Sequence, residues 1–467
     1  MSPAAGHRTS GPADYLGSPV SPCEPATLAA VDDFVGGFLT YEPRALAVLK
    51  AADADAESAL ANAYAGVLHM LGEHMAAPAK AAAYLGRAEA APMANERERG
   101  IIAFLRAWIA DDIDAALAIA DEVVEAFPTD LAMVKLSQYL NLNRGDFPAM
   151  LRITDAALAA NFAVPQLHGM RAFAYEQCHL LADAEAAARQ ALHMHIREPW
   201  AQHALAHVML TQGRISEGGE FMDAASETWA GLNSFMYTHN WWHLALFHLS
   251  QGRGERVLEI YDRHCWTQDR TYSQDQIGAV SLLARLEFAG LEVGERWAGV
   301  AEHLVERAED VVQPFLSLQY LLGLARAGRP EAETLMAAIE RRVHEAPAHS
   351  RRAWAEAALP AAQAIMALER GRPGAAVERM GAALPRLVEV GGSHAQRDLF
   401  EQIFLEALLR DGRLSRAQQV LELRRAFDPD GVPLNLALAR VYDSLGLPEL
   451  AARAASRALR TQERHAC

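Results

Sequence analysis

Helix-forming segments recur along this chain at a regular spacing. The fifth residue counted from each turn between helices falls at positions that are 34 apart: Ala116, Met150, Ala184 and Gly218. The same spacing returns near the C-terminus, between Ala417 and Ala451. Turns such as "NRGD", "TQGR" and "RDGR" supply a glycine where one helix ends. A small residue after the turn lets the second helix approach its neighbour closely, and Met150 is the exception.

A helix–turn–helix unit with a period of about 34 residues is typical of tetratricopeptide repeats. Apolar residues recur at helical spacing in segments such as "IDAALAIADEVVEAF". The sequence therefore predicts an all-α fold, a tetratricopeptide-like superhelix of about ten to twelve helical hairpins that could close on itself. We expect this array over residues 26–460, with irregular repeats at about 257–417. Residues 1–25 are rich in Pro, Gly and Ser, and we expect a flexible tail there.

The repeat is interrupted once in its regular part. After Gly218 the regular spacing would put the equivalent position at Gly252, but it falls at Val257. Five residues are therefore inserted, and they lie in "SETWAGLNSFMYTHNWW" (226–242).

The bulk composition excludes several classes of protein. The net charge is −16 and the sequence pI is about 5.6, which argues against a general nucleic-acid binder. The sequence contains no run of 18 or more uncharged apolar residues, which argues against a membrane-spanning helix. Four cysteines are scattered without a C-x-x-C pair, which fits a reducing cytoplasm and disfavours a disulfide framework or thiolate zinc site: Cys23, Cys178, Cys265 and Cys467. The oligomeric state is not predicted.

Histidines are concentrated in one part of the chain. Ten of the 18 lie between His168 and His264, about a fifth of the sequence, where an even spread would put about four. Two pairs, in "HALAH" and "HNWWH", are spaced i, i+4, so each pair shares one face of its helix. The pairs are His203 with His207 and His239 with His243, and they are offset by about one repeat.

The first helix of each hairpin in a tetratricopeptide array lines a concave groove. Similarity to that architecture implies that all four paired histidines face or border this groove. It implies the same for Gln166, Phe173 and Glu176 on the preceding hairpin. Packing suffices to explain the remaining histidines and large apolar residues of this region: His193, His195, His248, His264, Trp241, Trp242 and Phe247.

Two chemistries suit the paired histidines. Two imidazoles at i, i+4 can chelate one divalent metal ion, with a carboxylate added by Glu176 or Asp398. "HALAH" lacks the glutamate of the H-E-x-x-H motif. Without a metal, the same imidazoles could act as general acid and base.

A second candidate cluster lies in "VEVGGSHAQRDLFEQIF" (388–404). Gly391 and Gly392 end one helix, and Ser393 is a suitable N-cap for the next. His394, Arg397 and Asp398 follow in the first turn of that helix. A capped helix with a surface Arg–Asp pair explains these residues locally. Alternatively, the turn folds over the groove and Arg397 holds an anionic group.

Several motifs resemble the tetratricopeptide repeat protein 38 family, which has bacterial and animal members. The resemblance covers residues 30–460 and identifies the chain as similar to a bacterial member. It rests on "HALAHVMLTQGR" (203–214), "GGEFM" (218–222), "HNWWHLALFHL" (239–249), "LEIYD" (258–262), "VGERW" (293–297) and "GGSHAQRDLF" (391–400). The resemblance implies a tetratricopeptide-like superhelix, without a defined reaction. The matching positions are His203, His207, His239, Asn240, His243, Gln396, Arg397 and Asp398.

This chain departs from the family at two places. Relatives tend to read "FNDxHxxMA" where this chain has "FLSLQYLLGL", with Leu316, Ser317 and Gln319. Relatives also tend to carry an aspartate where this chain has Gly278. These differences imply a changed substrate or a weakened site if the positions bind a ligand in relatives.

Two classes of function remain. The first class is an enzyme, a hydrolase or lyase, that acts on a small polar or anionic molecule with one divalent metal ion or none. Four imidazoles in one place favour this class. The second is a scaffold that binds a peptide segment in the groove without catalysis. The candidate catalytic residues are His203, His207, His239, His243, Glu176 and Asp398. The candidate substrate-binding residues are Arg397, Asn240, Gln396, His394 and Trp242. The candidate metal ligands are His203, His207, His239 and His243.

Overall fold

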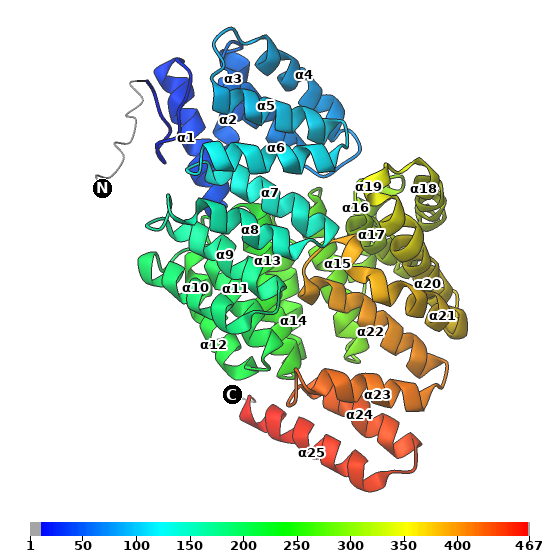
Figure 1. Ribbon diagram of the computed structural model, residues 1–467. Helices are drawn as coiled ribbons and strands as arrows, with labels where there is room; N and C mark the ends of the chain where they lie inside the picture. Colours follow the sequence, from blue (N-terminus) through cyan, green and yellow to red (C-terminus); the bar gives the residue numbers. More distant parts are fainter. Residues whose placement is uncertain (1–10, 466–467) are drawn as a thin grey trace. The chain divides into compact units, whose positions relative to one another are not determined.

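The computed structural model describes residues 11–465, and over this range the chain is all-α, as predicted. Helical hairpins of the tetratricopeptide type follow one another along the chain (Figure 1). The helices are α1 (Pro25–Thr40), α2 (Ala47–Ala54), α3 (Ala59–Met70), α4 (Ala77–Ala90), α5 (Glu96–Ile109), α6 (Ile113–Ala126), α7 (Leu131–Arg144), α8 (Phe147–Leu158), α9 (Pro165–Gln177), α10 (Leu181–Met194), α11 (Pro199–Thr211), α12 (Ile215–Ala225), α13 (Ser234–Ser250), α14 (Gly254–Ile260), α15 (Ser273–Phe288), α16 (Arg296–Leu304), α17 (Pro314–Arg326), α18 (Glu331–Glu345), α19 (Ala348–Ala353), α20 (Leu359–Glu369), α21 (Pro373–Ala383), α22 (His394–Arg410), α23 (Leu414–Arg425), α24 (Val432–Ser444) and α25 (Pro448–Arg464).

The chain forms two compact units. The first comprises the chain up to Asn141 together with Ala149–Leu167, and the second comprises Leu142–Pro148 together with the chain from His168 onward. Every candidate site residue predicted from the sequence, apart from Gln166, belongs to the second unit. Within residues 11–465, none of the helices combines the length and the hydropathy that a membrane span needs.

In the first unit, residues 11–24 differ from the predicted flexible tail. The carboxylate of Asp14 is buried and lies 3.0 Å from Arg97 Nη2, while Arg97 Nε donates to Asp130 at 2.7 Å. Ser21 N also donates to Glu98 Oε1 at 2.8 Å. These contacts fasten the segment to α5. Residues 1–10 lie outside the described range, and for them the tail stays a prediction.

The starts of the helices show where the repeat changes. The first helices α9 and α11 begin at Pro165 and Pro199, one full period apart, and α13 begins at Ser234, one position later than the period predicts. The second helices α12 and α14 begin at Ile215 and Gly254, and the distance between these two starts is five residues longer than one period. Helix α13 has 17 residues against 13 in α11, so most of the predicted insertion lengthens this helix instead of forming a loop.

Glycine at the small-residue position explains how α12 packs on α13. A Cβ atom at Gly218 would overlap the ring of Phe247. The aromatic side chain therefore fills the space that a larger residue on α12 would need, and Phe247 is fully buried. Between residues 257 and 417 the helices are less regular and include π-helical turns at Tyr261–Cys265 and Trp354–Ala358, with 3-10 turns at Val305–Arg307 and Leu384–Val390.

Candidate metal centre

The four paired histidines converge, as the helical spacing predicts. His203 and His207 come from α11, and His239 and His243 from α13. The ring centroid of His203 lies 4.5 Å from that of His207, 4.9 Å from His239 and 4.7 Å from His243. His207 and His243 are 4.5 Å apart. Each ring therefore contacts others of the set, which we call the four-histidine cluster.

One ring nitrogen of each histidine lies close to those of the other three. His203 Nε2 lies 3.1 Å from His207 Nε2 and 3.1 Å from His239 Nε2. One nitrogen from each of the four rings can be chosen so that all lie within 4.8 Å of one another. His203 Nε2 is within hydrogen-bond distance of both neighbours, but a neutral ring nitrogen either donates or accepts, so its tautomer decides the direction of these contacts. His243 is different: among the described residues, neither of its ring nitrogens has a hydrogen-bond partner.

Burial keeps these imidazoles neutral. His203, His207 and His243 are almost fully buried, and His239 is partly buried. Burial, with the neighbouring imidazoles as a further cause, lowers the pKa of His203 and of His243 well below the ordinary value. The pKa of His239 falls to about 3 for the same reasons. Each ring therefore keeps a free lone pair at neutral pH.

Aromatic side chains surround the cluster. The ring of Trp200 stacks on His203 at 4.3 Å, and Trp242 stacks on His239 at 5.5 Å with an angle of 8°. Phe173, predicted to face the groove, packs 5.2 Å from His203. Trp242 is thus part of the site wall, and the guanidinium of Arg285 lies 5.3 Å from the centroid of its ring. The sequence did not single out Trp200 or Arg285.

Glu176 extends the cluster on the side of His207. Its Oε2 lies 3.4 Å from His207 Nδ1, and its Oε1 is hydrogen-bonded to His394 Nε2. Gln177 Nε2 donates to Oε2 at 2.6 Å. Burial raises the pKa of the Glu176 carboxyl, but His394 and His207 together lower it further, so the net shift is downward. Glu176 is therefore ionised.

The "GGSHAQRD" segment brings His394 to this carboxylate. Ser393 caps α22 by accepting from Gln396 N, and Gln396 Oε1 accepts in return from Ser393 N at 3.0 Å. Gly391 and Gly392 have φ values of 92° and 76°, which favour glycine. A Cβ atom at Gly392 would also come within 2.7 Å of Phe315. The predicted fold-over of this turn is thus found for His394, the first residue of α22.

Asp398 does not join the histidines. Its Oδ1 lies 2.5 Å from Arg424 Nη1, and its Oδ2 accepts from Gln402 at 2.6 Å and lies 3.7 Å from Arg285. Burial raises the pKa of Asp398, but the two arginines lower it to about 2. These contacts account for Asp398 as an ion-pair partner between α22, α23 and α15. The predicted catalytic carboxylate is therefore Glu176 alone.

Of the predicted substrate-binding residues, Arg397 and Gln396 make contacts within the fold, whereas Asn240 makes no side-chain hydrogen bond within the described residues. Arg397 donates to Gly392 O and lies 5.2 Å over the ring of Phe147, and its charge interacts with Glu401 and, less strongly, with Glu176. Gln396 is engaged as a helix cap. Asn240 is fully buried beside His239, and within the described residues neither atom of its amide has a hydrogen-bond partner.

The histidines assigned to packing lie outside the cluster. His248 is buried against Gln251, with Nδ1 3.2 Å from Oε1. His264 stacks on Trp241 at 3.7 Å and is hydrogen-bonded to Tyr237. His193 and His195 are exposed.

The positions that depart from the family motifs are compatible with packing. Leu316, Ser317 and Gln319 are buried on α17, where Ser317 Oγ donates to Asp310 O at 2.9 Å. At Gly278 on α15, a Cβ atom would meet no other atom within 4 Å. A longer side chain would therefore fit at Gly278 without a clash at its first carbon.

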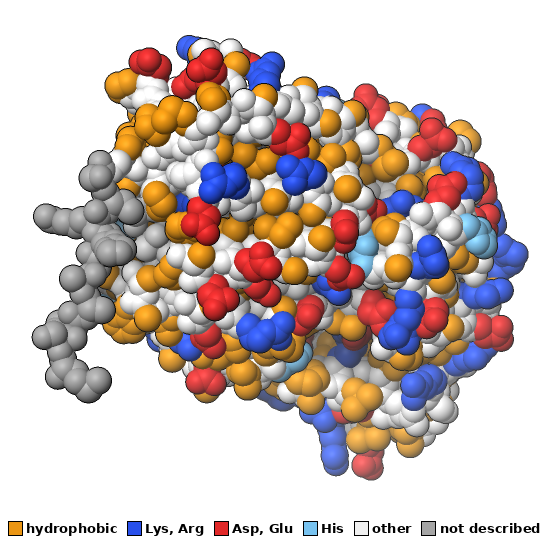
Figure 2. Space-filling view, turned by 45° about the horizontal axis from the view of Figure 1, so that its top comes forward, with side chains coloured by type: hydrophobic (Ala, Val, Ile, Leu, Met, Phe, Trp, Pro, Cys, Tyr) orange, Lys and Arg blue, Asp and Glu red, His pale blue; other side chains and the backbone are white. Residues whose placement is uncertain are grey.

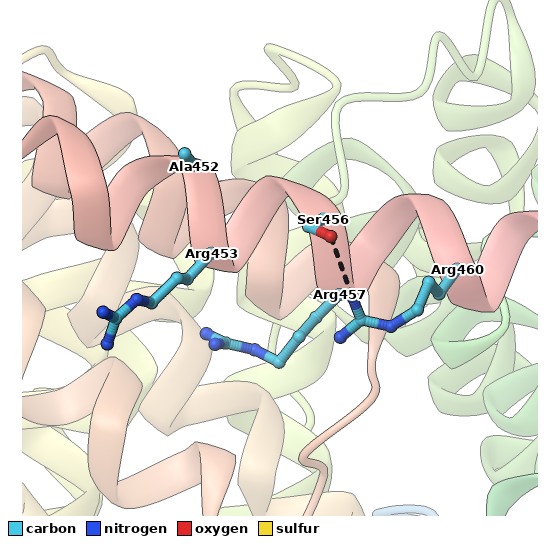
Figure 3. A pocket seen from close by; sticks show the side chains of 5 residues that line it. All are labelled: Ala452, Arg453, Ser456, Arg457 and Arg460. Carbon is cyan, nitrogen blue, oxygen red and sulfur yellow. Dashed lines mark hydrogen bonds between the residues drawn. The ribbon is translucent and has the colours of Figure 1, made fainter.

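A separate depression of about 410 Å³ lies along α25 and contains none of the predicted site residues. Arg453, Arg457 and Arg460 project from one side of the helix there, because positions i, i+4 and i+7 share a face (Figure 3). Arg457 Nε donates to Asn435 at 2.7 Å, and Arg460 donates to Ser456 at 2.7 Å. On the face drawn in Figure 2, acidic and basic side chains are interspersed.

No protein-family model matches the chain. Solved structures with a similar fold include the human IFIT1 dimer with PPP-AAAA, which is 13% identical over 97% of this chain and 96% of that chain, with a TM-score of 0.42. A Rap protein complexed with competence and sporulation factor is 12% identical over 83% and 94%, with a TM-score of 0.37. The APC/C hetero-tetramer Cut9-Hcn1 is 12% identical over 94% and 87%, with a TM-score of 0.35. Such distant likenesses carry no information on function. The chain is a tetratricopeptide-like helical repeat protein with a buried histidine cluster.

Proposed function

We propose that the chain is a metal-dependent enzyme whose four-histidine cluster binds one divalent transition-metal ion, such as zinc. Its substrate would be a small polar or anionic molecule, and its reaction a hydrolysis or an elimination. The resemblance to the tetratricopeptide repeat protein 38 family includes these four histidines, and we offer that family relationship as part of the same proposal.

The observation that carries the proposal is the approach of ring nitrogens around His203. Nitrogens bound to one zinc ion at about 2.0–2.1 Å in a tetrahedron are separated from one another by about 3.3 Å. His203 Nε2 lies 3.1 Å from two other Nε2 atoms, close to that spacing. Two nitrogen–nitrogen separations of the cluster thus match what a shared ion requires, and the others are at most 4.8 Å.

His243 argues that hydrogen bonds alone do not explain the cluster. A buried polar atom without a partner costs about 1–3 kcal/mol. Among the described residues, His243 has two such nitrogens, although its ring touches the other three histidines. A cation held by the four rings would use one of them. The residues present therefore fit a metal ion with imidazole ligands.

A divalent ion bound here would supply a Lewis acid and would lower the pKa of a water molecule bound as a further ligand to about 7. Residues of the chain itself would orient the metal ligands and bind the substrate. Glu176 lies 3.4 Å from His207 Nδ1, where a carboxylate commonly orients a ligating histidine so that Nε2 faces the metal. Arg397 is the candidate to hold an anionic group, because a guanidinium suits anions and it follows His394 in the first turn of α22. Asn240, which follows His239 on α13, has an amide without a hydrogen-bond partner among the described residues.

Metal analysis of the purified protein tests the binding step. We expect at least one divalent ion per chain in the wild type and the loss of one ion in a His203→Ala/His243→Ala variant. The matched control is His193→Ala/His195→Ala, which removes two exposed histidines outside the cluster and should keep the full metal content. Wild-type protein that takes up no zinc, cobalt or nickel would overturn the proposal.

Turnover tests the catalytic step separately. We expect the metal-loaded wild type to hydrolyse p-nitrophenyl phosphate or p-nitrophenyl acetate, and a chelator to abolish this activity. The His203→Ala/His243→Ala variant should stay inactive when the metal is returned. A metal-loaded protein that turns over neither probe and instead binds peptides in its groove would support the scaffold alternative.

A further inference from the structure

We propose that Glu176, His207 and His394 hold a second divalent metal ion, and that the ring of His207 bridges the two ions. This inference rests on the proposed function, since the first ion is the one held by the four-histidine cluster. It assigns each nitrogen of His207 to a different metal.

The two nitrogens of His207 already face different ligand sets. Nε2 lies 3.1 Å from His203 Nε2, inside the four-histidine cluster. Nδ1, across the ring, lies 3.4 Å from Glu176 Oε2. One imidazole is therefore shared between two groups of donors, and a metal on each side of the ring is the arrangement that uses both.

The second group has the composition of an open metal site. A carboxylate oxygen of Glu176 and one nitrogen each of His207 and His394 all lie within 4.8 Å of one another. Two histidines and one glutamate are a common ligand set in catalytic zinc sites, which leave a further position for water or substrate. Four histidines around one ion, by contrast, fill a tetrahedron and admit water only as a fifth ligand. The second group is thus the better place for a substrate to reach a metal.

The exposure of the side chains also favours the second group as the place where a substrate reaches a metal. The side chains of Glu176 and His207 are 0% exposed, whereas that of His394 is 23% exposed. A molecule from solvent would therefore meet the His394 side of the pair first.

The orientation of His207 by Glu176 does not explain why His394 is also there. One carboxylate oxygen would suffice to orient His207. Instead, an imidazole from a helix 218 residues further along the chain reaches the other oxygen. Gln177 also binds that segment, since its Oε1 accepts from His394 N at 3.3 Å. The fold therefore brings a third donor to the carboxylate.

The protons balance as follows. A neutral His207 ring carries one N–H proton, and coordination through both nitrogens releases it to solvent. His394 binds through Nε2 as a neutral imidazole, so the proton that it shares with Glu176 is released or moves to Nδ1. No oxidation or reduction is involved.

Copper(II) is the probe that separates one ion from two. The wild type is loaded with copper(II), freed of excess by gel filtration, and analysed for copper content and electron paramagnetic resonance. We expect two copper ions per chain and a much weakened resonance, because an imidazolate bridge couples the two spins antiferromagnetically. The variant His394→Ala should keep one copper with a full-intensity signal. The control His193→Ala should behave as the wild type.

Glu176→Gln serves as a second variant, because it keeps the side-chain size if His394→Ala impairs folding. It should likewise bind one copper ion at full intensity. A wild type with one copper at full intensity overturns this inference and leaves the four-histidine site in place. Two uncoupled copper ions, or two ions retained in both variants, also overturn it. A wild type without copper overturns both proposals.

Discussion

His203 and His207 stand on successive turns of α11 with their Nε2 atoms 3.1 Å apart. The i, i+4 spacing puts the two rings on one face but leaves their orientation free. Trp200, stacked on His203 at 4.3 Å, and Glu176, 3.4 Å from His207 Nδ1, set those orientations. The approach of the two nitrogens is therefore a product of the neighbours of α11 as well as of its sequence.

Replacement of Asn240 by leucine is expected to separate stability from function. Leucine is similar in size and removes an amide that has no hydrogen-bond partner among the described residues. The free energy of unfolding in urea should rise by about 1–3 kcal/mol. Turnover of p-nitrophenyl phosphate should fall, because the amide is proposed to face the substrate.

The matched control is Asn435→Leu. Asn435 is equally buried, but its Nδ2 donates to Pro429 O and Gly431 O, and its Oδ1 accepts from Arg457. This variant should lose stability by a similar amount. A destabilised Asn240→Leu variant would show that the Asn240 amide is part of the fold instead.

The cap at Ser393 is expected to control the position of His394. Ser393→Ala removes the side chain that accepts from Gln396 N, and the free energy of unfolding should fall by about 1 kcal/mol. Ser393→Gly should cost only a few tenths of a kcal/mol. Zinc titration followed by calorimetry is expected to show weaker binding in the alanine variant than in the glycine variant. Equal stability of the two variants would contradict a role for the capping box.

The sequence predicted the local parts of this site well. The repeat period places α9 and α11 correctly, and the two i, i+4 pairs predict that His203, His207, His239 and His243 converge. Helical geometry alone carries this information, since neighbouring repeats present equivalent faces.

The distant contacts followed less directly from the sequence. Helical spacing alone does not pair His394 with a carboxylate 218 residues earlier, because that contact depends on how irregular repeats turn the chain. The same holds for Asp398, whose partners Arg424 and Arg285 come from two other helices. A local pattern shows which residues share a helix face, but not which distant helix covers that face.

Substitution of Gly218 tests whether a small residue is needed where α12 packs on α13. Its Cβ position is occupied by the ring of Phe247, so Gly218→Ala should lower the free energy of unfolding by about 1–3 kcal/mol through overpacking. The control is Gly299→Ala in α16, where a Cβ atom would meet nothing within 4 Å. Higher helix propensity should make that variant more stable, by about 0.5–1 kcal/mol. Thermal unfolding measures both, and a stabilised Gly218→Ala variant would contradict the close approach of α12 and α13.

Asp275 gives the stability of the second unit a defined pH dependence. Its side chain is 1% exposed and accepts from Ser234 Oγ and, at 3.1 Å, from Thr238 Oγ1. Burial raises the pKa of Asp275 from 3.8 to about 6, although these hydrogen bonds oppose the shift. The folded chain therefore holds a proton that the unfolded chain has already lost between pH 4 and pH 6.

The sign of the effect follows from this difference in bound protons. Below pH 4 the carboxyl is protonated in both states, and its contribution to stability is complete. As the pH rises to about 6, that contribution is lost, by roughly 3 kcal/mol at most, since one pKa unit corresponds to about 1.4 kcal/mol. Urea unfolding at pH 4, 5, 6 and 7 should show this fall in the wild type and a smaller fall in Asp275→Asn. The exposed Asp443→Asn is the control and should match the wild type. If Asp275→Asn and the wild type lose equal stability over this range, Asp275 is not the titrating group.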